Sequence, residues 1–161
     1  LENVTIHARY EKMREADDKG ASVTVDVAHN PQAARVLAAN LTASGNPDVE
    51  TWAVFGMLRD KDMQEVAHTL LRHFDRWFVA GLPGVRGASL EELTEAMTKA
   101  GIDSTKIVKN DTVADALATA LAESAKLEKG SVRIIAFGSF VTAAAVIECL
   151  RHDAREGAKV A

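Results

Sequence analysis

The stretch Ser22-Val23-Thr24-Val25-Asp26-Val27-Ala28-His29-Asn30-Pro31 decides the fold of this chain. Its first half is rich in β-branched residues, which predicts a short buried strand. Asn30 followed by Pro31 predicts the start of a helix, because asparagine caps helix N-termini and proline suits the first helical position. Asp26 lies at the end of the strand, where a charge is costly unless it has a partner, and His29 adds an imidazole three residues later. The stretch therefore predicts a functional site on a strand-to-helix turn.

Strands and helices alternate along the rest of the chain. We expect strands at 51–55, 76–80, 106–108 and 132–137, and helices at 31–41, 63–74, from 89 onward, 113–127 and 141–151. This alternation predicts βαβ units, and hence an α/β fold of three layers with a mostly parallel sheet and helices on both faces. Outside the pattern, residues 4–6 are a candidate further strand, 9–19 are expected to form a solvated hairpin or loop, and the tail after Arg151 is expected to fray.

Length and composition narrow the class of protein. A chain of 161 residues is the size of one domain. Its net charge of −4 argues against nucleic acid or an anionic membrane as the main partner. Cys149 is the single cysteine, and no apolar stretch has the length of a membrane span, so we expect a cytoplasmic protein. The chain begins at Leu1 without a methionine, which indicates a fragment or a processed product.

Four segments are expected to meet at the carboxyl ends of the strands, where α/β folds bind ligands: 26–31, 56–62, 81–88 and 137–140. Helix N-termini at this edge favour an anionic ligand. In the last segment, Gly138 permits a close backbone approach, and Ser139 either caps a helix or offers its hydroxyl to a ligand. Spacing alone supports both interpretations of Ser139 equally.

The other candidates have plain structural interpretations beside functional ones. Asp26 capping a loop beside a hydrogen-bonded His29 would give the same sequence as a catalytic pair, although a carboxylate at a strand end favours function. Asp60 or Asp62 is expected to cap a helix, and Arg86 either holds a carboxylate or phosphate or is a surface arginine. No metal-ligand spacing is present. The phosphate loop, the dinucleotide-binding turn and the nucleophile elbow are also missing, so the catalytic machinery is incomplete.

A family resemblance extends this interpretation. The segment Asp26-Val27-Ala28-His29-Asn30-Pro31-Gln32-Ala33-Ala34 resembles the hallmark segment of the bifunctional dihydrofolate synthase/folylpolyglutamate synthases, and segments 56–62, 83–88 and 137–140 match in the same order. The resemblance is to the Rossmann-like C-terminal domain of these Mur-type ligases. It implies that residues 1–161 form one such domain of a larger enzyme, whose N-terminal ATPase domain is missing from this chain.

The resemblance also implies a reaction. ATP phosphorylates a folate carboxylate, and the amine of L-glutamate attacks the acyl phosphate, so that an amide, ADP and phosphate are the products. The expected acceptors are dihydropteroate, tetrahydrofolate polyglutamates or both; the expected cofactors are ATP and Mg²⁺, with the metal ligands in the N-terminal domain. The isolated domain is expected to be inactive. The alternatives are another Mur-type amino-acid ligase, or a separate module that binds a nucleotide or an amino acid.

Site residues follow from the resemblance position by position. Arg9 and Asp26 are expected to bind ATP, His29 to act in catalysis or in glutamate binding, and Ser139 to bind glutamate. The chain departs from the family in two places. A proline-led turn before Arg9 is replaced and followed by the insert 12–20, and Val141 stands where the family often has a histidine, so any role of that imidazole is lost or reassigned.

Overall fold

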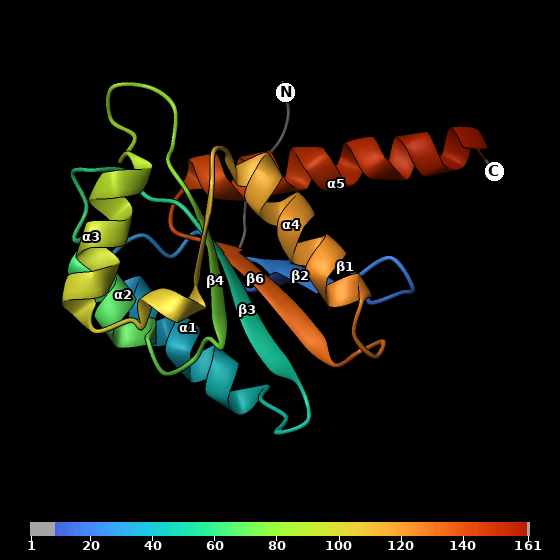
Figure 1. The fold of residues 1–161 in the computed structure, drawn as a ribbon, viewed down its shortest axis with the longest axis horizontal. Coiled ribbons are helices and arrows are strands. Elements are labelled where there is room, and N and C mark those ends of the chain that lie inside the picture. The colour runs from blue at the N-terminus through green and yellow to red at the C-terminus, as the bar shows by residue number, and fades with distance from the viewer. Residues whose placement is uncertain (1–8, 161) are drawn as a thin grey trace.

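A six-stranded sheet in the order β1-β2-β6-β3-β4-β5 forms the centre of the computed structural model, which describes residues 9–160 (Figure 1). The strands are β1 (Glu11–Arg14), β2 (Ser22–Val25), β3 (Glu50–Phe55), β4 (Arg76–Ala80), β5 (Ile107–Asn110) and β6 (Val132–Phe137). All neighbours are parallel except β1, which pairs antiparallel with β2. The predicted mostly parallel α/β fold is confirmed.

Helices cover both faces of the sheet, as Figure 1 shows. They are α1 (Pro31–Ala43), α2 (Met63–Leu70), α3 (Leu90–Ala100), α4 (Val113–Ala125) and α5 (Phe140–Val160), with a short 3₁₀ helix η1 (Ser104–Lys106) before β5. Helices α1 to α3 pack on one face of the sheet, and α4 and α5 pack on the other. The buried side chains of the two groups accordingly belong to two separate hydrophobic clusters. The sheet lies between two helical layers.

The core beneath α1 to α3 is held by aromatic rings. Phe137 stacks on Phe74 with the ring centroids 5.3 Å apart, and its centroid lies 4.8 Å from that of Phe55. Trp77 packs edge-on against Phe55 at 5.3 Å. All four rings are at most 3 % exposed. Such pairs add to the free energy gained by burying apolar area, so the middle of the sheet is the rigid base from which the loops project.

The largest differences from the sequence-based expectations are a strand in segment 9–19 and the ends of two helices. Segment 9–19 forms a hairpin, as one of the two expectations had it, but the hairpin contains the strand β1, whose charged side chains at the sheet edge give no apolar alternation. The expected fraying after Arg151 is wrong: α5 continues to Val160, with residues 151–158 exposed. Good helix formers such as alanine, arginine and glutamate sustain it without a core. Helix α2 ends at Leu70, four residues earlier than expected. The strand expected at 4–6 lies outside the described residues.

The turn from β2 to α1 is built as the sequence indicates. The N–H of Asp26 donates to the carbonyl of Ala136 at 2.9 Å and so extends the pairing with β6 by one residue. The side chain of Asn30 accepts the N–H of Ala33 at 2.8 Å and caps α1, with Pro31 at the first helical position. This turn delivers Asp26 and the helix N-terminus to the same edge of the sheet.

Candidate functional site

A pocket of about 330 Å³ opens at the carboxyl end of β2, between Arg9 and helix α1. Its lining residues are Arg9, Asp26, Val27, Ala28, His29, Asn30, Gln32, Ala33, Val36 and Asn40. The fold therefore brings three of the four predicted site residues, Arg9, Asp26 and His29, into one cavity. Ser139 lies outside it.

Asp26 is the buried charge of this pocket, with 8 % of its surface exposed. Its Oδ1 accepts the N–H of Ala28 at 2.7 Å, and the N–H of Tyr10 donates to the same carboxylate. Burial raises the pKa of Asp26 above its ordinary value, and the two backbone hydrogen bonds and the charge of Arg9 offset this only in part. A carboxylate accepts about four hydrogen bonds. Asp26 thus retains acceptor capacity for a ligand that carries donors.

His29 has one ring nitrogen committed to the backbone. Its Nδ1 lies 2.8 Å from the carbonyl oxygen of Val27, and because a carbonyl only accepts, Nδ1 carries the proton of that hydrogen bond. Nε2 of the neutral ring is then an acceptor. The ring also lies against Phe140, with centroids 6.1 Å apart. His29 consequently joins the pocket to the first turn of α5.

Ser139 is buried and caps α5. Its Oγ accepts the N–H of Thr142 at 3.0 Å, and the Thr142 hydroxyl in turn donates to the carbonyl of Gly56 at 2.9 Å. Gly138 permits this contact, since a Cβ there would lie 2.2 Å from the Gly56 oxygen. The close backbone approach predicted at Gly138 is therefore to Gly56, in the loop after β3. The capping interpretation of Ser139 is confirmed, and its role in glutamate binding stays a prediction.

The remaining candidates form ion pairs and caps between loops. Asp62 caps α2 by accepting the N–H of Glu65 at 3.2 Å. Asp60 accepts from Arg86 at 2.9 Å, and Arg59 donates to Glu92 at the same distance. Of the two predicted roles of Arg86, the structure thus shows that it holds a carboxylate, that of Asp60.

Sequence reasoning missed one wall of the pocket. Gln32, Val36 and Asn40 follow one another at intervals of four, so they lie on one stripe of α1. Val36 is 60 % exposed. A valine between two amides on the polar face of a helix was the signal available in the sequence.

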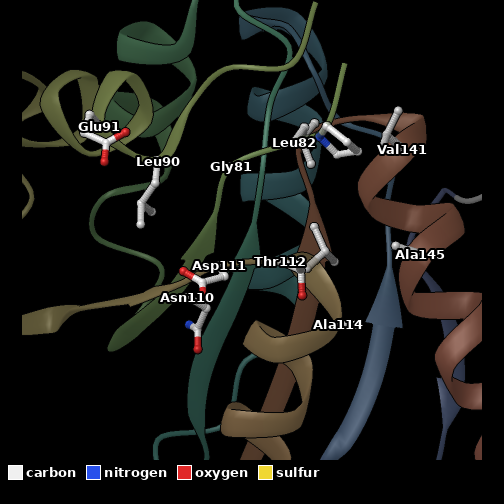
Figure 2. A pocket seen from close by; sticks show the side chains of 12 residues that line it. Gly81, Leu82, Leu90, Glu91, Asn110, Asp111, Thr112, Ala114, Val141 and Ala145 are labelled. Carbon is white, nitrogen blue, oxygen red and sulfur yellow. The ribbon is translucent and has the colours of Figure 1, made fainter. Parts of the chain in front are cut away.

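A second cavity, of about 520 Å³, lies at the carboxyl ends of β4 and β5 (Figure 2). Its lining is mostly apolar, with the carboxylates of Glu91, at the start of α3, and Asp111, before α4. The amide of Asn110 is already used: Nδ2 donates to the carbonyl of Val108, and Oδ1 accepts from Thr119. The two carboxylates repel an anion, and none of the predicted site residues lies here. The pocket beside Asp26, which holds three of the predicted site residues, is therefore the candidate for the predicted ligand site.

Metal-ligand groups and membrane-spanning helices are both absent from the described residues, 9–160. Within this part of the chain, no group of three histidine, cysteine, aspartate or glutamate side chains is placed to hold a metal ion. In the same residues, no helix is both long and apolar enough to cross a membrane.

With this geometry established, comparison with known proteins identifies the family. Residues 8–140 match the family model described as Mur ligase, glutamate ligase domain. The chain belongs to this family. The dihydrofolate synthase/folylpolyglutamate synthase of Haemophilus influenzae is 37 % identical over 131 residues, which cover 79 % of this chain and 29 % of that protein. The resemblance that the four sequence segments indicated is confirmed.

Solved structures of the same family share the fold of the glutamate ligase domain. Escherichia coli FolC in complex with ADP superposes with a TM-score of 0.76 at 32 % identity, covering 96 % of this chain and 33 % of that one. A bifunctional folylpolyglutamate synthase/dihydrofolate synthase with Mn, AMPPNP and L-glutamate bound gives a TM-score of 0.74 at 29 % identity, covering 94 % and 33 %. The chain thus spans about a third of the length of the proteins it matches.

Proposed function

We propose that this chain is the glutamate ligase domain of an ATP-dependent amide ligase of the dihydrofolate synthase/folylpolyglutamate synthase type. In the proposed reaction, the γ-phosphoryl group of ATP passes to a folate carboxylate, giving ADP and an acyl phosphate. The amine of L-glutamate then attacks the acyl carbon, losing a proton and displacing phosphate, so that an amide forms. Residues 1–161 would form one domain, and its partner would be the ATPase domain of the same protein.

The observation that carries the proposal is the pocket that joins Arg9 and Asp26 beside the N-terminus of α1. An exposed guanidinium and a helix N-terminus suit phosphate oxygens. The free acceptor sites of Asp26 suit the hydroxyl or amino donors of a nucleoside. Val27, Ala33 and Val36 supply apolar lining for a flat base. These residues fit ATP.

His29 and Ser139 are proposed to act on the glutamate side. With Nδ1 of His29 bound to the carbonyl of Val27, Nε2 remains to accept a proton or a hydrogen bond. Ser139 would act through its cap, which fixes the first turn of α5 and leaves the early N–H groups of that helix to face a carboxylate. The ligands of magnesium are proposed to lie in the ATPase domain, as the family resemblance implies.

The test is incorporation of L-glutamate by the full-length protein that carries this chain, with ATP, using dihydropteroate and tetrahydrofolate as separate acceptors. We expect Arg9→Ala and Asp26→Ala to raise KM for ATP. Arg35→Ala removes an exposed guanidinium of α1 outside the pocket and serves as the control. Failure to use either acceptor would overturn the proposed activity, and incorporation of another amino acid would favour a different Mur-type ligase. Unchanged ATP kinetics in both variants would overturn the assignment of the site.

A further inference from the structure

Tyr10 holds a backbone conformation that few residues other than glycine adopt. Within the described residues it is the one non-glycine position with a positive φ, at +56°. Such a conformation persists only where the surroundings fix it. The N–H of Tyr10 donates to the Asp26 carboxylate, and Arg9, the preceding residue, lines the pocket. The turn at Tyr10 therefore sets the direction in which Arg9 leaves the sheet edge.

The side chain of Tyr10 is fixed at its far end. Its hydroxyl lies 2.6 Å from Ser44 Oγ, and Arg133 donates to it at 3.2 Å. Arg133, from β6, also donates to Ser44 Oγ at 2.7 Å, to the carbonyl of Leu41 at 3.0 Å and to the hydroxyl of Thr51 at 2.8 Å. We call Tyr10, Ser44 and Arg133 the Tyr10 clamp. The clamp ties the segment that carries Arg9 to the end of α1.

The Tyr10 clamp reaches the opposite wall of the pocket directly. Ser44 follows the last residue of α1, and its hydroxyl donates to the carbonyl of Asn40 at 2.7 Å. That donation uses the one hydroxyl proton of Ser44, so Tyr10 is the donor in the 2.6 Å contact. Tyr10 thus contacts Asp26 through its backbone N–H and Ser44 through its hydroxyl, and Ser44 in turn contacts the backbone of Asn40. Asp26 and Asn40 both line the pocket.

We propose that Tyr10 is a positioning residue for the nucleotide site: held by Ser44 and Arg133, it fixes Arg9 over the pocket and sets the separation of Arg9 from α1. Tyr10 itself does not line the pocket. Its effect passes through Arg9 and through the N–H that it donates to Asp26. The inference rests on the proposed function, because it concerns the residues assigned there to ATP.

The experiment uses the full-length protein that carries this chain. Tyr10→Phe keeps the ring and removes the hydroxyl, and Ser44→Ala removes its acceptor. We expect each to raise KM for ATP roughly three- to ten-fold, the range for one lost hydrogen bond, with kcat at saturating ATP and KM for glutamate unchanged. The loss in the double variant should be smaller than the sum of the two single losses, since both variants remove the same Tyr10–Ser44 contact. Thr51→Val, which removes a different partner of Arg133, is the matched control and should leave KM for ATP unchanged.

The outcomes separate this inference from the function on which it rests. If Arg9→Ala raises KM for ATP and Tyr10→Phe does not, the positioning role is overturned and the proposed function stands. If Arg9→Ala leaves KM for ATP unchanged, the positioning role is overturned as well, because Tyr10 then has no site residue to position; the proposed function is decided separately, by Asp26→Ala and by glutamate incorporation. A change of equal size in KM for ATP and for glutamate, or in the Thr51→Val control, would mean that the clamp supports only the fold. Thermal unfolding of every variant gives the fraction of protein that is folded at the assay temperature, by which each measured rate is corrected.

Discussion

Gly138 lies where two backbone segments touch, and replacing it with alanine tests that contact. A Cβ at this position would lie 2.2 Å from the carbonyl oxygen of Gly56 and 3.1 Å from Cγ of Met57, at a φ of +118°. The backbone strain costs about 1–3 kcal/mol. Displacing the Gly56 carbonyl, which also accepts from Thr142, costs a further ~1–3 kcal/mol of packing. We expect Gly138→Ala to lower the free energy of unfolding by about 2–6 kcal/mol, a large part of the 5–15 kcal/mol that is typical of a domain.

The assay is urea unfolding followed by the fluorescence of the buried Trp52 and Trp77. Gly84→Ala is the matched control: φ there is +88°, but no atom lies within 4 Å of the added Cβ. It isolates the backbone strain, so we expect a loss of about 1–2 kcal/mol. If Gly138→Ala loses no more free energy than Gly84→Ala, the close approach to Gly56 does not matter and the reasoning is refuted.

Three other predictions concern stability. The pKa of Asp26 is raised, so the stability that its protonated form contributes is fully present below the ordinary value of 3.8 and is lost as pH rises through the folded-state pKa. Asp26→Asn avoids that loss, so its advantage over the parent in free energy of unfolding should grow as pH rises above 3.8, and an advantage independent of pH would contradict this. Ser89→Ala removes a complete capping box and should cost about 1 kcal/mol in urea unfolding, whereas a cost near zero would show that α3 does not need it. Arg76 lies 5.0 and 4.9 Å from two aromatic ring centroids, so Arg76→Gln should cost about 1 kcal/mol, more than Glu123→Gln, which breaks only the partly exposed ion pair; equal costs would argue against the ring contacts.

The strands and helices that pack in the core were predictable because their sequences must satisfy two constraints at once: they must favour the local conformation, and they must place apolar side chains on the buried face. The strand β6 is an apolar run, and α1 combines a cap, a first-turn proline and buried residues at helical spacing. The edge strand β1 and the end of α5 need not place apolar side chains on a buried face. Charged side chains serve β1 well at an edge, and α5 beyond Arg151 needs only helix-forming residues. Periodicity contains no information on either.

The sequence predicted three pocket residues that contribute their own side chains to the lining: Arg9, Asp26 and His29. The parts that depend on distant partners were not predictable. No pattern signals a tyrosine in the left-handed region, since its φ is fixed by bonds to residues 16 or more positions away. Arg133 gave a weak signal, as the one charge within the apolar strand β6, where it is costly without partners. Its partners lie on α1, β3 and the segment before β1, and only the fold brings these together.

The raised pKa of Asp26 distinguishes a side chain kept for a ligand from one kept for the fold. Burial outweighs the two backbone hydrogen bonds and the nearby guanidinium, so the ionised carboxylate lowers the stability of the domain at neutral pH. A residue kept for packing would not be charged there, and asparagine would accept the same N–H groups without the charge. A ligand that donates hydrogen bonds to the carboxylate favours its ionised form. Ligand binding then offsets the free energy that burying the ionised carboxylate costs on folding. Asp26→Asn should therefore stabilise the domain and weaken nucleotide binding together, which is the behaviour of a site residue and not of a structural one.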